Sequence, residues 1–419
     1  MSTALPAEER SPRRSGPREQ AAAVLGLLDR PLTSYYLVLG CTFMLLALGL
    51  VMVLSASTVD QIQATGSAYT LLQKQALWVA IGLPGMWLAS RLPVKTFRAM
   101  AYPLLLLSAV ALAMVLVPGL GQSANGATRW IALGPFQLQP SEPAKLALVL
   151  WGADLLARKE RLGRLTEWRP LLVPLLPGAG VLVLLVMLGS DLGTTLVLLT
   201  IFLALLWVVG APGRLFVGMA GLVGMLVSIL IVVEPYRMQR LTGFLDQSAD
   251  TSGIRYQGTQ GVYALASGGW FGTGLGEGRA KWDFLPHAET DFIFAIVGEE
   301  FGLVGTLVVL GLFGLLAYAG LRIARRVKDP FTRLAAAGAT AWLVVQAIVN
   351  IGAVIGVLPI TGIPLPLVSY GGSALIPTLI ALGMLLAFAK REPGARQALA
   401  ARGPGPVLRA LSWLGLARR

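Results

Sequence analysis

Four stretches of the chain place acidic, basic and hydroxyl side chains directly beside long apolar runs. They are residues 125–145, 190–195, 287–295 and 358–373. Ionisable groups at the edge of an apolar run lose hydration, so they are functional candidates by default. A carboxylate there can take a proton from a hydroxyl group, and a lysine or arginine can stabilise developing negative charge. The pattern therefore indicates proton transfer and anion binding at the boundary of an apolar region.

Glu142 and Lys145 are three residues apart, which places them on one face of a helix where they can pair. Ser141 suits the N-cap of that helix and Pro143 suits its first turn. Taken alone, these residues favour a capped helix with a local ion pair. Asp191 has two interpretations that are equally balanced, the N-cap of another helix or a functional charge paired with Lys145.

Asp291 ends the longest polar segment and directly precedes the apolar residues Phe292–Ala295. A carboxylate at that junction is a candidate general base. The alternative is that Asp291 caps the helix that follows, and the residue taken alone slightly favours this alternative. Glu299 and Glu300 would lie about 12–14 Å further along the same helix, where they would pair or line a polar cavity.

The composition excludes a water-soluble globule, a disordered chain, a collagen and a disulfide scaffold. Of the 419 residues, 55% are hydrophobic and 13% are charged, and the mean hydropathy is +0.71. Soluble domains carry about 25% charged residues. The single Cys41 cannot form an internal disulfide, and the single His287 excludes a site with several histidine ligands. These values are typical of a membrane protein.

Ten apolar runs are candidates to cross a bilayer, for which a helix needs about 20 residues. They lie at residues 35–56, 71–90, 101–117, 143–157, 170–188, 193–210, 214–233, 292–320, 334–357 and 373–389. The sequence thus predicts an all-α polytopic membrane protein with ten transmembrane helices. A long loop at 235–290 separates the seventh and eighth helices, and loops of that length usually carry function.

Lysine and arginine orient these helices, because cytoplasmic loops are enriched in them. With both termini in the cytoplasm, 26 of the 34 basic residues fall on the inner side. The chain then consists of a basic tail at 1–34, a membrane domain at 35–389 and a second basic tail at 390–419, with the 235–290 loop outside. The net charge of +13 belongs to the membrane edges rather than to a surface for nucleic acid.

All four polar stretches lie on the outer face in this topology. Helix caps with no common role would be distributed over both faces. The bias therefore indicates a single extracytoplasmic site built from several loops.

The polar stretches resemble those of the SEDS family of polytopic proteins, which includes RodA and FtsW. Gln139–Lys145, Asp191–Thr195, Thr290–Ala295 and Pro364–Ser373 match in order and spacing, and the likeness extends from Gly49 to Lys390. Residues 298–303 and 388–393 look more like FtsW, the division member. The resemblance implies an inverting peptidoglycan glycosyltransferase that joins lipid II units on the outer face of the cytoplasmic (inner) membrane, at the division septum, and releases undecaprenyl diphosphate.

The resemblance also implies roles for individual residues. The family's proposed catalytic aspartate matches Asp291, which would act as the base. Glu142 and Asp191 would hold Lys145, and Mg²⁺ or Mn²⁺ would suit the pyrophosphate oxygens, with no organic cofactor. The candidates for pyrophosphate binding or support are Glu142, Lys145, Asp191, Arg129, Arg237, Arg240, Gln257, Lys281, Ser369 and Tyr370.

The implied partners are a class B penicillin-binding protein and other membrane proteins of the division complex, and nucleic acid is not among them. One feature departs from the family pattern. In Pro286-His287-Ala288-Glu289 the acid and the imidazole have exchanged places, which puts a supporting role of either in doubt. Three alternatives stay open, namely a lipid II flippase, a RodA-like elongation polymerase and a non-catalytic scaffold for division enzymes.

Overall fold

The computed structural model describes residues 30–124, 127–134, 136–163, 168–233, 254–282 and 284–401, and these are mostly helical. Every predicted apolar run lies on a helix. The helices are α2 (Thr33–Thr65), α3 (Thr70–Ala89), α4 (Val94–Val115), α5 (Ser141–Arg161), α6 (Trp168–Leu188), α7 (Leu192–Val209), α8 (Gly213–Val233), α11 (Ile293–Arg326), α12 (Pro330–Val354) and α13 (Leu375–Ala389), the last preceded by the 3₁₀ turn η1 (Gly372–Ala374). Within the described residues, six segments are long and apolar enough to cross a membrane: α2, α4, α7, α11, α12 and Gly372–Ala389.

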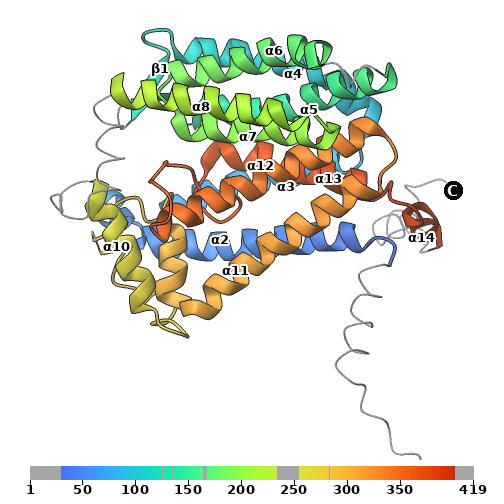
Figure 1. The fold of residues 1–419 in the computed structure, drawn as a ribbon. Coiled ribbons are helices and arrows are strands. Elements are labelled where there is room, and N and C mark those ends of the chain that lie inside the picture. The colour runs from blue at the N-terminus through green and yellow to red at the C-terminus, as the bar shows by residue number, and fades with distance from the viewer. Residues whose placement is uncertain are drawn as a thin grey trace, which may run out of the picture.

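Helix α12 lies at the centre of the bundle. It packs against α5, α7, α11 and α13. Figure 1 shows α4–α8 on one side of it and α2 with α11 on the other. The large side chains Trp342 of α12, Phe202 of α7 and Phe388 of α13 are buried around this centre. Helix α5 is buried along most of its apolar run and continues to Arg161, beyond the end of that run at residue 157.

A small antiparallel sheet corrects the all-α expectation. Its strands are β1 (Gly121–Ala124), β2 (Ala127–Leu133) and β3 (Phe136–Leu138), in the order β1-β2-β3. Gly121 pairs with Ile131, and Ile131 pairs with Leu138 on its other side. The sequence between β1 and β2 is Asn-Gly, a strong signal for a tight hairpin. The strands are short, so the sequence shows no extended alternation of apolar and polar residues that would predict them.

The long loop is folded against a break in α11. Gly302 interrupts that helix with φ 67° and ψ −162°, values that only glycine adopts readily. The Thr273 backbone amide donates to the Glu299 carbonyl at 2.9 Å, and the Leu303 amide donates to the Gly269 carbonyl at 2.9 Å. A short helix, α10 (Ile254–Ser267), precedes this part of the loop and packs on α11. The glycine-rich segment 272–278 therefore adjoins α11.

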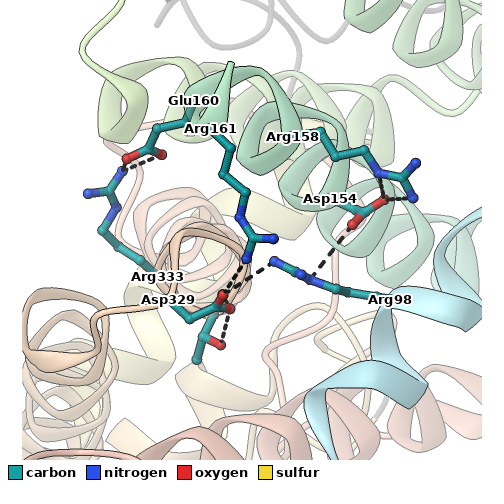
Figure 2. Close-up of polar contacts among 8 residues, drawn as sticks. Arg98, Asp154, Arg158, Glu160, Arg161, Asp329 and Arg333 are labelled. Atoms are coloured by element: carbon teal, nitrogen blue, oxygen red, sulfur yellow. Dashed lines mark hydrogen bonds and ion pairs between the residues drawn. The ribbon is translucent and has the colours of Figure 1, made fainter. Parts of the chain in front are cut away.

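The opposite end of the bundle carries a cluster of paired charges, which Figure 2 shows in close-up. Arg158 Nη2 of α5 lies 2.7 Å from Asp154 Oδ2, one turn away. Arg98 of α4 contacts Asp154 at 3.8 Å and Asp329 at 3.3 Å. Arg161 contacts the same Asp329 oxygen at 3.1 Å. These pairs join α4 and α5 to the start of α12.

Asp329 also caps α12. Its Oδ2 accepts the Thr332 backbone amide at 3.1 Å and the Thr332 hydroxyl at 2.8 Å. Partial burial opposes ionisation of this carboxyl, but the Thr332 hydrogen bonds and the charges of Arg98 and Arg161 outweigh it and lower the pKa of Asp329. One turn later Arg333 pairs with Glu160 of α5 at 2.8 Å.

Candidate active site

Five of the sequence-predicted site residues line a cavity of about 620 Å³ at the end of the bundle that holds the sheet, namely Arg129, Glu142, Asp191, Asp291 and Tyr370. Its walls come from α3, the sheet, the starts of α5 and α7, and the segments 287–291 and 362–372. The lining residues that carry charge or an aromatic ring are Lys74, Trp78, Arg129, Trp130, Glu142, Asp191, His287, Asp291 and Tyr370. All four polar stretches thus contribute to one pocket, as the sequence predicted.

Lys145 and Glu142 form a buried ion pair beneath this pocket. The Lys145 ammonium lies 2.7 Å from the Glu142 carboxylate, and both side chains are almost fully buried. Lys145 Nζ also donates to Gln346 Oε1 at 3.0 Å and lies 5.2 Å from the centre of the Trp342 ring. Glu142 lines the cavity, whereas Lys145 stays below it. Helix α5 begins at Ser141 with Pro140 as its cap residue, so Ser141 is not the N-cap.

Asp191 is both a helix cap and a wall of the pocket. Its Oδ1 accepts the Thr194 backbone amide at 3.1 Å, which confirms the N-cap interpretation for α7. Its Oδ2 lies 3.8 Å from Arg129 Nε and accepts the Gln139 side-chain amide at 3.4 Å. The close charged partner of Asp191 is therefore Arg129 rather than Lys145.

Asp291 lines the pocket, and the cap interpretation of this residue is wrong. Helix α11 begins at Ile293, and its cap residue is Phe292, with no side-chain capping bond. The Asp291 carbonyl accepts the Asn350 side-chain amide at 2.8 Å. A Cβ placed on Gly362 would lie 3.6 Å from Asp291 Oδ2 and 3.8 Å from Arg129 Nη1. The carboxylate, from the segment before α11, and the guanidinium, from strand β2, therefore approach the same glycine.

Ser369 and Tyr370 tie the proline-rich segment to the loop before Asp291. The Ser369 hydroxyl donates to the Thr290 carbonyl at 2.6 Å and accepts the Leu365 amide at 2.8 Å. The Tyr370 amide donates to the Glu289 carbonyl at 2.9 Å, and its side chain lines the pocket. Burial, together with the neighbouring Glu289, raises the pKa of the Tyr370 hydroxyl, which stays protonated.

Three polar side chains of α12, one turn apart, form a ladder that sequence reasoning missed. Gln346 accepts from Trp342 Nε1 at 2.8 Å and donates to the Pro364 carbonyl at 3.1 Å. Asn350 donates to the Ile363 carbonyl at 2.8 Å as well as to Asp291. The α12 ladder (Trp342, Gln346 and Asn350) therefore contacts both Lys145 and the backbone of Asp291 and fixes their positions relative to one another. The sequence feature that could have indicated the ladder is the spacing of these polar side chains, four residues apart within an apolar helix.

Several wall residues were also missed. Lys74 and Trp78 are one turn apart on α3, and Trp130 comes from β2. His287 lines the pocket with φ 57°, whereas Glu289 is not among the lining residues. Burial raises the pKa of Glu289, and its Oε2 has no hydrogen-bond partner. The exchanged order of imidazole and acid thus presents His287 to the cavity.

Two predicted site residues, Lys281 and Gln257, are not among the residues that line this pocket. Lys281 Nζ contacts Glu300 at 2.9 Å, Ser55 at 3.1 Å and the Gly276 carbonyl at 2.6 Å, which builds a separate buried cluster. The Gln257 side-chain amide donates to the Pro286 carbonyl at 2.8 Å and so braces the loop before His287. Arg237 and Arg240 lie outside the described residues.

In the described part of the chain, no three His, Cys, Asp or Glu side chains gather closely enough to hold a metal ion. The carboxylates of the pocket come from separate walls, with Glu142 on α5, Asp191 at the start of α7 and Asp291 before α11.

Comparisons with known proteins assign the chain to a family. A helical bundle with six described segments that are long and apolar enough to cross a membrane, and with a polar pocket at one end, defines an integral membrane protein. The model of the FtsW/RodA/SpoVE family, described as cell cycle protein, matches residues 35–393. The chain belongs to this family, which confirms the resemblance seen in the sequence.

Individual relatives agree with this assignment. The probable peptidoglycan glycosyltransferase FtsW of Mycobacterium tuberculosis is 45% identical over 406 residues, which cover 97% of this chain and 76% of the relative. Stage V sporulation protein E of Bacillus subtilis is 37% identical over 350 residues, which cover 82% of this chain and 94% of the relative.

Solved structures share the fold. A chain from a study of how a peptidoglycan synthase complex coordinates polymerization and crosslinking superposes with a TM-score of 0.70 at 33% identity, over 84% of this chain and 97% of that one. The crystal structure of the rod shape determining protein RodA of Thermus thermophilus gives a TM-score of 0.61 at 30% identity, over 85% and 97%.

Proposed function

We propose that the chain is a peptidoglycan glycosyltransferase that polymerises lipid II at the outer face of the cytoplasmic membrane. The observation that carries the proposal is the convergence of Asp291 and Arg129 on Gly362 in one polar pocket. A base and a cation in one cavity suit the transfer of a sugar from a pyrophosphate leaving group to a hydroxyl. The 45% identical FtsW is named for this activity.

Asp291 is the proposed base. The 4-hydroxyl of the acceptor's terminal GlcNAc attacks C1 of the donor MurNAc, and Asp291 takes the hydroxyl proton. The bond from C1 to the pyrophosphate oxygen breaks, and undecaprenyl diphosphate leaves with the electron pair. Because the new bond forms opposite the leaving group, the α linkage becomes β. A general base typically contributes about 10²–10⁴ to the rate of such a step.

Arg129 is the proposed pyrophosphate ligand, since its guanidinium reaches the pocket and only part of its charge is matched by Asp191 at 3.8 Å. Lys74 on the α3 wall is a second cation at the same cavity. Lys145 acts from below, because its charge fixes Glu142 and, through Gln346, the 363–365 segment. Mg²⁺ or Mn²⁺ on the pyrophosphate remains a prediction of the family resemblance.

The proposed placement has ten membrane crossings, both termini in the cytoplasm and the 235–290 loop outside. The distribution of basic residues supports it, because the paired arginines of Figure 2 then lie at the inner surface and the pocket lies at the outer one. The identity to FtsW supports a septal role in division, with a class B penicillin-binding protein and other division proteins as partners. The RodA match keeps elongation as the alternative role.

Transport of lipid II is a weaker alternative. A flippase would need charged groups that face a path through the membrane, and Glu299 and Glu300 are the acids within α11. The Glu299 carboxylate accepts backbone amides of Arg279 and Ala280, and Glu300 pairs with Lys281. Both acids thus have partners in the outer loop, which favours polymerisation over transport.

One reconstitution separates these functions. The purified protein is placed in proteoliposomes with fluorescent lipid II and its penicillin-binding partner. Polymerisation predicts glycan ladders on a gel, and transport predicts movement of the label between leaflets without ladders. If neither product forms while the partner is active, the chain is a scaffold and the proposed function is wrong.

A further inference from the structure

Large apolar side chains protrude from the described part of the long loop, and none of them lines the pocket. Trp270 is 71% exposed, Phe271 is 83% exposed and Trp282 is 60% exposed, and Leu275 lies exposed between them. We call these four residues the aromatic lip. Aromatic side chains that stand out into water are unfavourable in a soluble loop, so such a group marks an interaction surface.

Backbone contacts hold the lip rigidly against α11. The Val304 amide donates to the Trp270 carbonyl at 3.2 Å, and the Leu303 amide donates to the Gly269 carbonyl. Glu299 Oε1 accepts the Arg279 amide at 2.7 Å. The lip residues therefore face outwards because the folded backbone directs them, and a rotation of one side chain would not bury them.

Helix length sets the depth of the lip in the membrane. From the basic residue Arg325 to Leu303, α11 continues for 22 residues, or about 33 Å at 1.5 Å per residue. The hydrocarbon core of a bilayer is about 30 Å thick. With Arg325 among the inner headgroups, Leu303 and the adjoining Trp270 reach the outer boundary of the hydrocarbon. In Figure 1, α10 and the first segment of α11 stand off the bundle at that end, beside α2.

A groove continues from the lip along α2. It has a volume of about 480 Å³ and is lined mainly by apolar groups, among them Val51, Leu54 and Ile62 of α2 with Leu275 and Trp282 of the lip. The charged group at its wall is Lys281, whose ammonium is neutralised by Glu300 at 2.9 Å. The groove therefore offers no free charge to a phosphate, and its chemistry suits a hydrocarbon chain.

We infer that the aromatic lip is a membrane anchor, which inserts at the headgroup boundary of the outer leaflet and covers an acyl chain of a bilayer phospholipid lying in the groove along α2. Tryptophan favours this depth because its ring is largely apolar while its N–H can still bond to water or headgroups, and Phe271 and Leu275 add apolar surface. The anchor fixes the height of the first segment of α11, which follows Asp291. The inference rests on the membrane placement proposed above and concerns a surface away from the pocket.

Depth-resolved quenching tests this anchor. In a Cys41→Ala background, the variant Phe271→Cys carries an environment-sensitive NBD probe in nanodiscs of phosphatidylcholine and phosphatidylglycerol. The lipids carry bromine either close to the headgroup or close to the chain end, and iodide serves as the aqueous quencher. Trp270→Cys provides a second labelled position in case one label disturbs the loop.

Probes at two further positions serve as references for the hydrocarbon chain region and for water. Leu107 faces outwards from the middle of α4 and is 65% exposed, so a probe at Leu107→Cys reports the chain region. Ser67, between α2 and α3 at the outer end, is exposed, so a probe at Ser67→Cys reports water. A Leu107 probe that responded to iodide rather than to bromolipids would contradict the membrane placement itself.

The anchor predicts blue-shifted emission at positions 270 and 271, strong quenching by bromine near the headgroup, weaker quenching by bromine near the chain end, and protection from iodide. If both probes behave like the Ser67 probe, the inference is wrong. Shielding that appears only after a partner protein is added would mark a protein interface and would also overturn it. Shielding that requires lipid II would assign the groove to the substrate chain rather than to bilayer lipid.

Discussion

Helices α5 and α12 carry charged or polar clusters at both of their ends, and the two ends differ in kind. At the pocket end, which the proposed placement puts outside and which we call the outer end, Lys145 of α5 and Asn350 of α12 are buried and hold groups that face a cavity. At the other end, which we call the inner end, Arg161 and Asp329 pair with each other and remain partly exposed. The inner charges stabilise one another, whereas at the outer end the Lys145 charge fixes the position of Glu142 and the Asn350 amide fixes the backbone of Asp291. The role of a buried polar group therefore depends on what its partner faces.

The largest expected effect is the difference in activity between two variants, each of which lacks one cation, at the outer end in one and at the inner end in the other. We expect Lys145→Met to lower polymerisation by roughly 10²–10³, because the buried Glu142 loses its partner and the pocket wall loses its geometry. The matched control at the inner end is Arg333→Met, which breaks the pair with Glu160 at 2.8 Å and should leave activity within a few-fold. Glycan synthesis over a range of lipid II concentrations gives kcat and KM separately.

Loss of fold is distinguished from loss of positioning by melting in detergent. The double variant Glu142→Gln/Lys145→Met removes both buried charges, so it should melt closer to wild type than Lys145→Met does and remain inactive. Lys145→Met with wild-type kcat and KM would show that the outer pair is only structural, like the inner one.

A smaller effect is expected from the α12 ladder. Asn350→Leu removes the hydrogen bonds to the carbonyls of Asp291 and Ile363 while keeping the side-chain size. We expect kcat to fall by roughly 30-fold, since each of the two lost bonds to a positioned group costs about 1 kcal/mol, with little change in KM. Asn350→Asp should restore part of the shape but not the donated bonds. A fall in melting temperature with unchanged kcat would contradict the positioning role.

The fold of the bundle was largely predictable, because ten apolar runs appear in the sequence and each lies on a helix. The common pocket was predictable from the topology. The cap interpretation of Asp291 failed because a turn, closed by the Phe292 amide on the His287 carbonyl, delays the helix to Ile293. The ladder of α12 stayed hidden because isolated amide side chains in an apolar helix have many possible partners, and only tertiary packing selects them.

At the inner end, Asp329→Asn should lower stability by about 1 kcal/mol at neutral pH, since Asn caps less electrostatically and no longer attracts Arg98 and Arg161. The folded state lowers the pKa of Asp329, so the carboxylate stabilises the protein above its ordinary pKa of about 3.9 and this contribution disappears as the pH falls through the lowered value. Wild type and variant should therefore converge in melting temperature towards acidic pH. A constant difference down to pH 3 would contradict the ionic role.

At the outer end, the smallest effect is expected at Glu289, and its contribution to stability should change with pH in the direction opposite to that of Asp329. Burial raises the pKa of Glu289, so the folded protein holds the proton more tightly than the unfolded chain. The resulting stabilisation is complete below the ordinary value of about 4.3 and disappears as the pH rises through the raised value. Glu289→Gln stays neutral, so its melting temperature should rise relative to that of wild type as the pH increases. Parallel curves for the two proteins would show that Glu289 ionises normally.

The central claim is that Asp291 is the base of the outer pocket, and Asp291→Asn tests it most directly. Asparagine is nearly isosteric, and the carbonyl bond from Asn350 does not depend on the side chain. The measurement is the rate of glycan synthesis from lipid II by the purified variant with its penicillin-binding partner, beside the melting temperature of the same sample. We expect unchanged melting and a rate reduced at least about a hundredfold. A rate within a few-fold of wild type would contradict it.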